Sequence, residues 1–458
     1  MIHIINIINE YLWSFVTLVL VGGAIYFTLR SRGVQFRHLR DMVRITLGRD
    51  TKEKNTLGSF QAFAVSLASR VGTGNLAGVA SAIFVGGPGA VFWMWVMAVF
   101  GAATAFVEAT LAQLYKRRGD GTYYGGPAYY MTHGLHRKWM GILFAVLIVL
   151  AFGVANQIVQ SNTLITALAN ATGCSNVWIG LAIAAVTLVI IFGGIRRIAK
   201  FASLCVPFMA IGFILVALFV IITNIGELPR VLKLIVDDAF GIKQATGGLF
   251  GATIMQGVRR GLFSNEAGEG SAPNAAAIAE TSHPIKQGLL QAFGVFIDTL
   301  VICTCTAMII LISGLHDSGN DGIILTTMAL ESEIGPVGKY FITTAIFLFA
   351  YSTIIANYFY GETNIRFITK SKKYVVLFRI ATSVVIFVAA WVTLQEAWSM
   401  VDVMMGLMTL CNLAAIFPLS KYVWRLLDDY LRQKKAGKEP VFHRSQMPDI
   451  QSDIECWE

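Results

Sequence analysis

Long apolar stretches recur along almost the whole chain, and short polar segments separate them. A helix of about 20 apolar residues is long enough to cross the hydrocarbon core of a bilayer. The pattern therefore predicts eleven transmembrane helices, one for each apolar stretch. The predicted spans are residues 11–29, 58–84, 89–114, 139–169, 177–195, 201–224, 246–279, 286–314, 337–367, 374–394 and 397–419.

Two of these stretches are interrupted by polar, glycine-rich segments, at residues 70–75 and 261–270. In hydrocarbon, unpaired backbone groups are so costly that unwound backbone is tolerated only where it faces protein, water or a bound solute. Two broken helices that open two halves of similar length are typical of inverted-repeat transporters, which bind their solute near the bilayer midplane. The interruptions therefore predict both a transporter and the position of its site.

The first span stands apart, and the other ten divide into two sets of five. An odd number of spans in each half places the second copy upside down relative to the first, as an inverted repeat requires. The tail is expected to begin as a helix and to end in disorder, because it is charged and contains prolines. The predicted organisation is an N-terminal span with a basic linker (1–57), the first repeat (58–224), an extracellular connection (225–245), the second repeat (246–420) and a cytoplasmic tail (421–458).

Composition supports an integral membrane protein, since 55% of the residues are hydrophobic, 14% are charged and the mean hydropathy is +0.64. When the loops are assigned to alternating sides, 31 of the 36 Lys and Arg residues fall on one side. The positive-inside rule makes this side cytoplasmic, with the N-terminus outside the cell membrane and the C-terminus inside. The net charge of +9 follows from this asymmetry and does not indicate nucleic-acid binding. The six cysteines have no metal-ligand spacing and are expected to serve packing.

Four segments of the chain resemble one known family, the alanine or glycine:cation symporters, also called the sodium:alanine symporter family. They are residues 69–80 (SRVGTGNLAGVA), 125–130 (GGPAYY), 260–268 (RGLFSNEAG) and 298–300 (DTL). The resemblance implies an all-α, leucine-transporter-like fold of five plus five spans with one extra N-terminal span. It also implies sodium- or proton-coupled uptake of small neutral amino acids. The chain departs from the family pattern at Glu269, where members carry Gln or an apolar residue.

The first interruption offers backbone amides to a solute carboxylate. Thr73, Gly74 and Asn75 stand at the start of a half-helix, whose positive dipole end attracts anions. The glycines also allow a turn and the close approach of a solute. The alternative is helix packing, because Gly74 and Gly78 form a G-x-x-x-G motif.

Further pocket residues are expected on two other spans. Asn156 and Gln160, spaced i and i+4, give the third core span a polar face. The resemblance places this face in the solute pocket, and hydrogen bonding between helices is the alternative. Met255, Gln256 and Phe263 could complete the walls, although such residues also occur as ordinary core.

The resemblance also implies a sodium site between the first broken helix and the eighth core span. Ser352 and Thr353 would supply hydroxyl oxygens, and the backbone near Ala68 and Val71 would supply carbonyl oxygens. The alternative is that both hydroxyls bond to their own helix. Charged groups at membrane depth are costly and mark functional positions. Gate or scaffold roles are expected for Arg70, Glu266 and Glu269, for example through a Glu266–Arg70 pair, and direct contact of the carboxylates with the solute is the alternative.

These features predict a symporter that couples sodium, or alternatively protons, to the uptake of alanine, glycine or glutamine. Sodium would be a co-transported ion, and the lipid bilayer and the amino acid the other partners. A membrane channel or another solute carrier of the same fold is the alternative. An enzyme is not expected, because the sequence contains no G-x-x-x-x-G-K-[ST], H-E-x-x-H or G-x-S-x-G motif.

Overall fold

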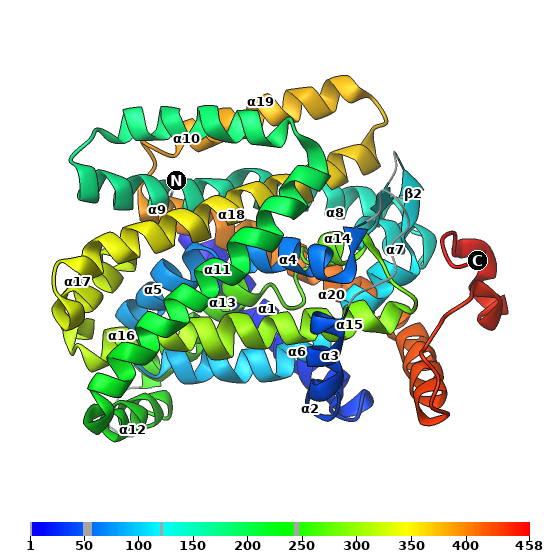
Figure 1. The fold of residues 1–458 in the computed structure, drawn as a ribbon, viewed down its shortest axis with the longest axis horizontal. Helices are drawn as coiled ribbons and strands as arrows, with labels where there is room; N and C mark the ends of the chain where they lie inside the picture. Colours follow the sequence, from blue (N-terminus) through cyan, green and yellow to red (C-terminus); the bar gives the residue numbers. More distant parts are fainter. Residues whose placement is uncertain (1, 49–56, 120–121, 242–246) are drawn as a thin grey trace.

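The structure is a computed structural model that describes residues 2–48, 57–119, 122–241 and 247–458. It is almost entirely helical, and most of the longer helices run roughly along the horizontal direction of Figure 1. The first part of the chain contains α1 (Ile2–Arg30), α2 (Val34–Arg37), α3 (Leu39–Leu47), α4 (Ser59–Arg70), η1 (Gly74–Gly78), α5 (Val79–Gly86), α6 (Ala90–Leu114), α7 (Pro127–His133), α8 (Lys138–Leu150), η2 (Ala151–Ala155), α9 (Asn156–Thr172), α10 (Asn176–Ile191), α11 (Gly194–Thr223), η3 (Ile225–Glu227) and α12 (Leu228–Ala239). The remainder contains α13 (Gly247–Asn265), α14 (Pro273–Ala276), α15 (Pro284–Val295), η4 (Phe296–Cys303), α16 (Thr304–Ile312), η5 (Leu315–Asp317), α17 (Gly322–Ile334), α18 (Val337–Ile368), α19 (Lys372–Val388), α20 (Leu394–Lys435), η6 (Arg444–Gln446) and η7 (Pro448–Asp453).

Seven helical segments of the described residues are long and apolar enough to cross a membrane. Two shorter apolar helices, residues 74–86 and α10, belong to further predicted spans. The chain is therefore a multi-pass membrane protein, and the total of eleven spans stays a prediction. The seven segments are Ile7–Arg30, Ala90–Leu114, Lys138–Thr172, Gly194–Thr223, Pro284–Ile312, Val337–Ile368 and Leu394–Lys435.

Both interruptions predicted from the sequence are present. The first helix stops at Arg70 and resumes at η1, which has π-helical geometry and leads into α5. The second helix, α13, ends at Asn265, and residues 266–272 are unwound. Within this segment Glu266, Gly268 and Gly270 have φ angles of 56°, 95° and 84°. Residues other than glycine rarely adopt such positive φ angles. The sequence predicted a longer inner half for this span, but α14 is a single turn.

Short strands join the segments that flank the broken helices. β1 (Leu57–Gly58) precedes α4 and pairs in parallel with β4 (Ala279–Glu280), which follows α14. A second pair, β2 (Arg117–Gly119) with β3 (Thr122–Tyr124), forms an antiparallel hairpin between α6 and α7. The β1–β4 pair therefore ties the beginning of the first broken span to the end of the second.

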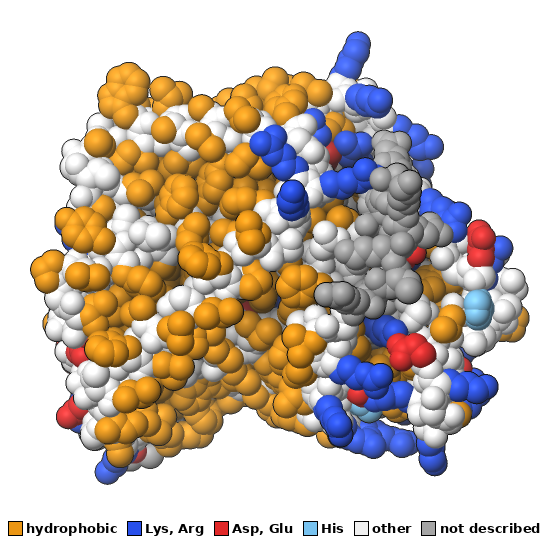
Figure 2. All heavy atoms as spheres, in the orientation of Figure 1, with side chains coloured by type: hydrophobic (Ala, Val, Ile, Leu, Met, Phe, Trp, Pro, Cys, Tyr) orange, Lys and Arg blue, Asp and Glu red, His pale blue; other side chains and the backbone are white. Residues whose placement is uncertain are grey.

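Basic side chains gather at one end of the molecule. In Figure 2 the Lys and Arg side chains lie mainly on the right, whereas hydrophobic side chains cover much of the rest of this face. The same end carries the β2–β3 hairpin and the C-terminus in Figure 1. Arg259 and Arg260 were counted from the sequence among the 31 basic residues of one side, and the structure corrects this. They line a cavity with Asn9 and Asp402, near the starts of α1 and α20. Their position follows from α13, which stays helical to Asn265 and so carries them within the span.

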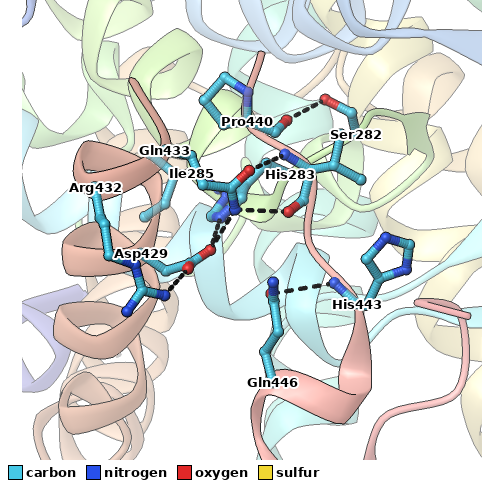
Figure 3. Close-up of polar contacts among 10 residues, drawn as sticks. Ser282, His283, Ile285, Asp429, Arg432, Gln433, Pro440, His443 and Gln446 are labelled. Atoms are coloured by element: carbon cyan, nitrogen blue, oxygen red, sulfur yellow. Dashed lines mark hydrogen bonds and ion pairs between the residues drawn. The ribbon is translucent and has the colours of Figure 1, made fainter. Parts of the chain in front are cut away.

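The tail folds back onto the basic end, which corrects the expected disorder of its last part. After α20 the chain turns towards the segment that precedes α15, as Figure 3 shows. The hydroxyl of Ser282 donates a hydrogen bond to the carbonyl of Pro440 (2.8 Å), and the amide of Phe442 donates one to the carbonyl of Ser282 (2.9 Å). Apolar residues of the tail, including Phe442 and Ile450, are buried by this docking, which the charged composition did not reveal.

Trp457 anchors the far end of the tail and is 4% exposed. Its indole donates a hydrogen bond to the carbonyl of Gln113 near the end of α6 (3.0 Å). Its ring lies 4.5 Å from the ammonium group of Lys116, which donates to the carbonyl of Ala279 (2.9 Å). Burial lowers the pKa of Lys116 from 10.5 to about 7. The tail therefore connects α20 with α6 and with the segment before α15.

Docking of the tail should strengthen as the pH rises above about 7, the pKa of buried Lys116. Lys116 binds its proton more weakly in the docked state than when it is exposed. At pH values between about 7 (docked) and 10.5 (exposed), undocking therefore takes up a proton. The free energy of docking should change by at most about 1.4 kcal/mol per pH unit. Hydrogen exchange of residues 440–458, corrected for its intrinsic pH dependence, would measure this. Lys116→Met keeps the alkyl chain, and equal pH dependence in that variant would contradict the assignment.

Candidate functional site

A cavity of about 810 Å³ lies between the start of α1, the end of α5, residues 252–260 of α13 and the start of α20; we call it the outer cavity, a name that marks only its place away from the basic end. Inside it Arg260 and Asp402 form a buried ion pair of 2.5 Å. The Arg260 guanidinium also lies 4.1 Å from the centre of the Trp398 ring, a cation–π arrangement. Trp398 in turn contacts Phe263 edge to face, with ring centres 4.6 Å apart.

This stack separates the outer cavity from the first interruption. Gly74 lies directly against the Phe263 ring, and a Cβ atom at Gly74 would come within 3.0 Å of that ring and 3.2 Å of the Cα of Ser264. The two broken helices therefore touch at Gly74. Trp398 and Phe263 therefore lie between the outer cavity and the unwound backbone.

At the first interruption the amide of Thr73 donates a hydrogen bond to the side-chain oxygen of Gln160 (3.0 Å). The side-chain amide of Gln160 donates to Asn156 (3.0 Å), and the amide of Gly72 donates to the side-chain oxygen of Asn75 (2.9 Å). All of these groups are buried. The Gln160 oxygen thus occupies the position in which a carboxylate would meet the Thr73 amide.

Asp298 joins the two broken helices from a third element, the π-helical segment η4. Its carboxylate accepts hydrogen bonds from Asn75 after the first break (2.7 Å), Ser264 before the second (2.7 Å) and Thr299 (2.9 Å). The sulfur of Cys303 also contacts Asn75 (3.3 Å) and Ser264 (3.1 Å), so this cysteine has polar contacts beyond packing. π-Helical segments of this kind often lie at functional sites.

A cluster of oxygen atoms lies between α4 and α18. The hydroxyl of Thr353 donates to the carbonyl of Ala68 (2.8 Å) and lies 3.4 Å from that of Val71 and 3.0 Å from that of Phe349. The hydroxyl of Ser352 donates to the carbonyl of Phe349 (2.9 Å). The cluster is buried and its members are uncharged oxygens, the ligands that hard cations prefer.

Towards the basic end, Glu108 of α6 receives the amides that the second interruption sets free. Gly268 and Gly270 donate to its two oxygens (3.2 and 3.1 Å), and Asn412 donates from α20 (2.8 Å). The unwound segment is therefore stabilised by a carboxylate from another helix. Because this carboxylate accepts three hydrogen bonds, the freed amides are satisfied without water.

Arg70 and Glu266 do not form the simple pair that is one possible scaffold. The carboxylate of Glu266 accepts hydrogen bonds from Ser69 (2.5 Å) and Ser271 (2.6 Å). The guanidinium of Arg70 donates to the carbonyl of Gln291 (3.1 Å), while its Nε and Nη2 atoms have no partner among the described residues. Arg70 acts on Glu266 as a nearby charge.

Most of the candidate residues named from the sequence meet around the first interruption. One group lies around its amides and comprises Thr73, Gly74, Asn75, Asn156, Gln160 and Phe263. A second group forms the oxygen cluster and comprises Ala68, Val71 and Thr353, with Ser352 adjacent. Met255 and Gln256 instead line the outer cavity, about 10 to 12 Å from Phe263 towards the start of α13.

Sequence reasoning assigned no role in the site to four groups: Asp298, Glu108, the carbonyl of Phe349 and the Arg260–Asp402 pair. Asp298 meets Asn75 across 223 positions, and Glu108 meets Asn412 across 304, so spacing gave no signal. The Phe349 carbonyl could have been found, because Ser and Thr in helices bond to carbonyls three or four residues earlier. Arg260 could have been found as a charge within a span.

A model of the sodium:alanine symporter family matches residues 1–444 of the chain. The probable sodium/glutamine symporter GlnT of Bacillus subtilis (strain 168) is 53% identical over 458 residues, which cover 99% of this chain and 96% of the relative. The amino-acid carrier protein AlsT of the same organism is 47% identical over 455 residues, or 99% and 97% of the two chains. The crystal structure of MhsT in complex with L-phenylalanine superposes with a TM-score of 0.58 at 13% identity, covering 88% of this chain and 94% of that one. The superposition on MhsT shows that the two proteins share a fold.

Proposed function

Because this chain belongs to the sodium:alanine symporter family, we propose that it couples sodium entry to the uptake of a small neutral amino acid by alternating access. Members of this family are transporters and not enzymes. Sodium binds in the oxygen cluster formed by Ala68, Val71, Phe349 and Thr353, with Ser352 as a further ligand. The carboxylate of the amino acid binds the amides of Thr73 and Gly74.

One observation carries this proposal: the same short stretch of backbone serves both groups. The carbonyl of Val71 lies 3.4 Å from the Thr353 hydroxyl, and the amide of Thr73, two residues on, donates to the side-chain oxygen of Gln160. A sodium ion that fixes the Val71 carbonyl therefore also fixes the amides offered to the amino acid. Each ligand then favours the backbone conformation that the other needs, and this coupling must be reciprocal.

Glutamine, alanine and glycine are the amino acids to test first, since the similar proteins are named a probable sodium/glutamine symporter and an amino-acid carrier. Uptake of a panel of labelled amino acids into proteoliposomes, under imposed sodium or proton gradients, would identify both solute and ion. A sodium gradient should drive accumulation of at least one of the three. Ion currents far above carrier turnover, without accumulation, would favour a channel and overturn the proposal.

The basic end is proposed to face the cytoplasm, and single cysteines would test this orientation. In a background without native cysteines, including the exposed Cys174, cysteines at Asn176 and Gly319 should react with an impermeant thiol reagent from outside. A cysteine at Ser371 should not react, because it lies among the basic residues near Arg366 and Lys372. Labelling of intact cells would measure both. The opposite pattern would reverse the orientation of the two broken helices.

A further inference from the structure

Four carboxylates and one guanidinium are buried together beneath the first interruption. The carboxylates belong to Glu108, Glu266, Glu269 and Asp298, and each residue is at most 1% exposed. Arg70 is the cation that acts on all four of them. If every group were charged, four negative charges would face one positive charge away from water. Uncompensated buried charge is strongly unfavourable, so this cluster must hold protons or further cations.

Hydrogen bonding shows which of the four carboxyl groups is least suited to carry a negative charge. Glu108 accepts three hydrogen bonds, Glu266 accepts two and Asp298 accepts three, and such donors favour a charged carboxylate. Glu269 is fully buried, and neither of its oxygens has a hydrogen-bond partner among the described residues. A charged carboxylate in that position would be both unsolvated and unpaired. A neutral carboxylic acid there lacks the same partners, but its burial costs far less.

We propose that Glu269 is a proton-binding site, which holds a proton in this closed conformation and releases it when the cytoplasmic path opens. The inference rests on the proposed symport and adds a second ion to it. Binding is a simple protonation of the carboxylate: the proton comes from water on the extracellular side before the path closes, and it returns to water at the cytoplasmic end. The unwound segment that carries Glu269 runs through α14 to β4, where the carbonyl of Ala279 accepts a hydrogen bond from Lys116 at the basic end, so opening there would expose Glu269.

A proton fits this position better than a sodium ion does. Sodium requires several oxygen ligands at once, such as the cluster around Thr353 provides. No hydroxyl or amide of the described residues lies within hydrogen-bond distance of the Glu269 oxygens. The charged groups that face it are Glu266 on its own segment, Glu108 on α6 and Arg70 on α4.

Two phenols complete the titratable surroundings of the cluster. Tyr130 of α7 hydrogen-bonds to Asn412, which in turn donates to Glu108. Tyr360 of α18 interacts electrostatically with Glu266 and Arg70. Both phenols are neutral near physiological pH and leave the excess of negative charge unchanged. The proton therefore has to reside on a carboxylate.

Infrared spectroscopy of the purified protein tests the site without any transport assay. A difference spectrum between wild type and Glu269→Gln should contain the carbonyl band of a protonated carboxyl group. Glu227→Gln removes an exposed carboxylate at the surface and should leave that band in place. If the wild-type and Glu269→Gln spectra agree in this region, the proposal is wrong. Should the Gln variant not fold, Glu269→Asp must shift the band, and an unshifted band would also overturn the proposal.

A second measurement links the proton to the amino acid. At saturating sodium, wild-type amino-acid affinity should change with pH, by at most about tenfold per pH unit for one proton, and Glu269→Gln should flatten this profile. Glu269→Asp, which keeps a titratable group, should retain a pH-dependent profile. A Gln variant with the wild-type profile would overturn the link. Absence of sodium-dependent amino-acid binding in the wild type would instead refute the proposed symport and leave the infrared result standing.

Discussion

Replacing Gly74 by valine should abolish amino-acid binding while the protein remains folded in the membrane. The two broken helices touch at Gly74, where a Cβ atom would already come within 3.0 Å of the Phe263 ring and 3.2 Å of the Ser264 backbone. A branched side chain adds two more carbon atoms at this contact and must push the helices apart. Binding titration of the purified variant would show the loss, and gel filtration with a thermal melt would establish that it is folded. The expected loss of affinity exceeds about a hundredfold, or about 2.7 kcal/mol.

Gly78→Ala is the matched control for Gly74→Val. Gly78 follows one turn later on the same helix, and a Cβ atom there would meet its nearest neighbours, the Trp398 ring and the Thr73 carbonyl, at 3.7 and 3.8 Å. These are ordinary contact distances, so the control should bind nearly as well as the wild type. Equal loss in both variants would favour helix packing as the role of the G-x-x-x-G motif. Normal affinity for an uncharged amide analogue of the amino acid would refute carboxylate recognition at the amides.

Removing both hydroxyls with Ser352→Ala and Thr353→Ala together should weaken sodium binding by about tenfold or more, or at least about 1.4 kcal/mol. The oxygen cluster would then retain the carbonyls of Ala68, Val71 and Phe349 and no side-chain ligand. By linkage, amino-acid affinity at fixed sodium should fall as well, and more sodium should restore it. Binding titrations at several sodium concentrations would measure both effects.

The same helix provides a matched control for this double variant. Thr343 and Thr344 are also adjacent hydroxyl residues of α18, and they bond to the carbonyls of Lys339 and Tyr340 within their own helix (2.8 and 2.9 Å). Thr343→Ala with Thr344→Ala should leave the sodium dependence unchanged. If the Ser352 and Thr353 variant also kept the wild-type sodium dependence, sodium would have to bind elsewhere. Proton coupling through the buried carboxylates would then become the leading account.

The sequence predicted well those parts of the fold in which polar residues interrupt an apolar stretch. Glycines and polar residues within an apolar stretch indicated both interruptions, because such residues are costly in a helix that faces lipid. The second interruption was harder to describe, since the length of α14 depends on where β4 pairs with β1. The prediction of a disordered tail was wrong because it rested on the charged composition. Two aromatic residues, Phe442 and Trp457, are buried against the rest of the protein and hold the tail in place.

The parts of the site that sequence did not reveal depend on contacts between distant residues. Arg260 pairs with Asp402 across 142 positions, and Glu108 meets Gly268 across 160. No periodicity relates such residues, because helix packing alone brings them together. The Thr353 cluster could be anticipated only through family resemblance, since a hydroxyl in a helix has a local bonding alternative that the Phe349 contact also satisfies.

The docked tail has a consequence for any attempt to displace it. It is joined to α20, so its binding is intramolecular, and the tether holds it near its receptor surface at an effective concentration on the order of millimolar. A soluble peptide copied from residues 438–458 would compete with a segment that never diffuses away. Such a peptide would have to be supplied at millimolar concentration, or carry added affinity, before it replaced the tail at its contacts with Lys116 and Ser282.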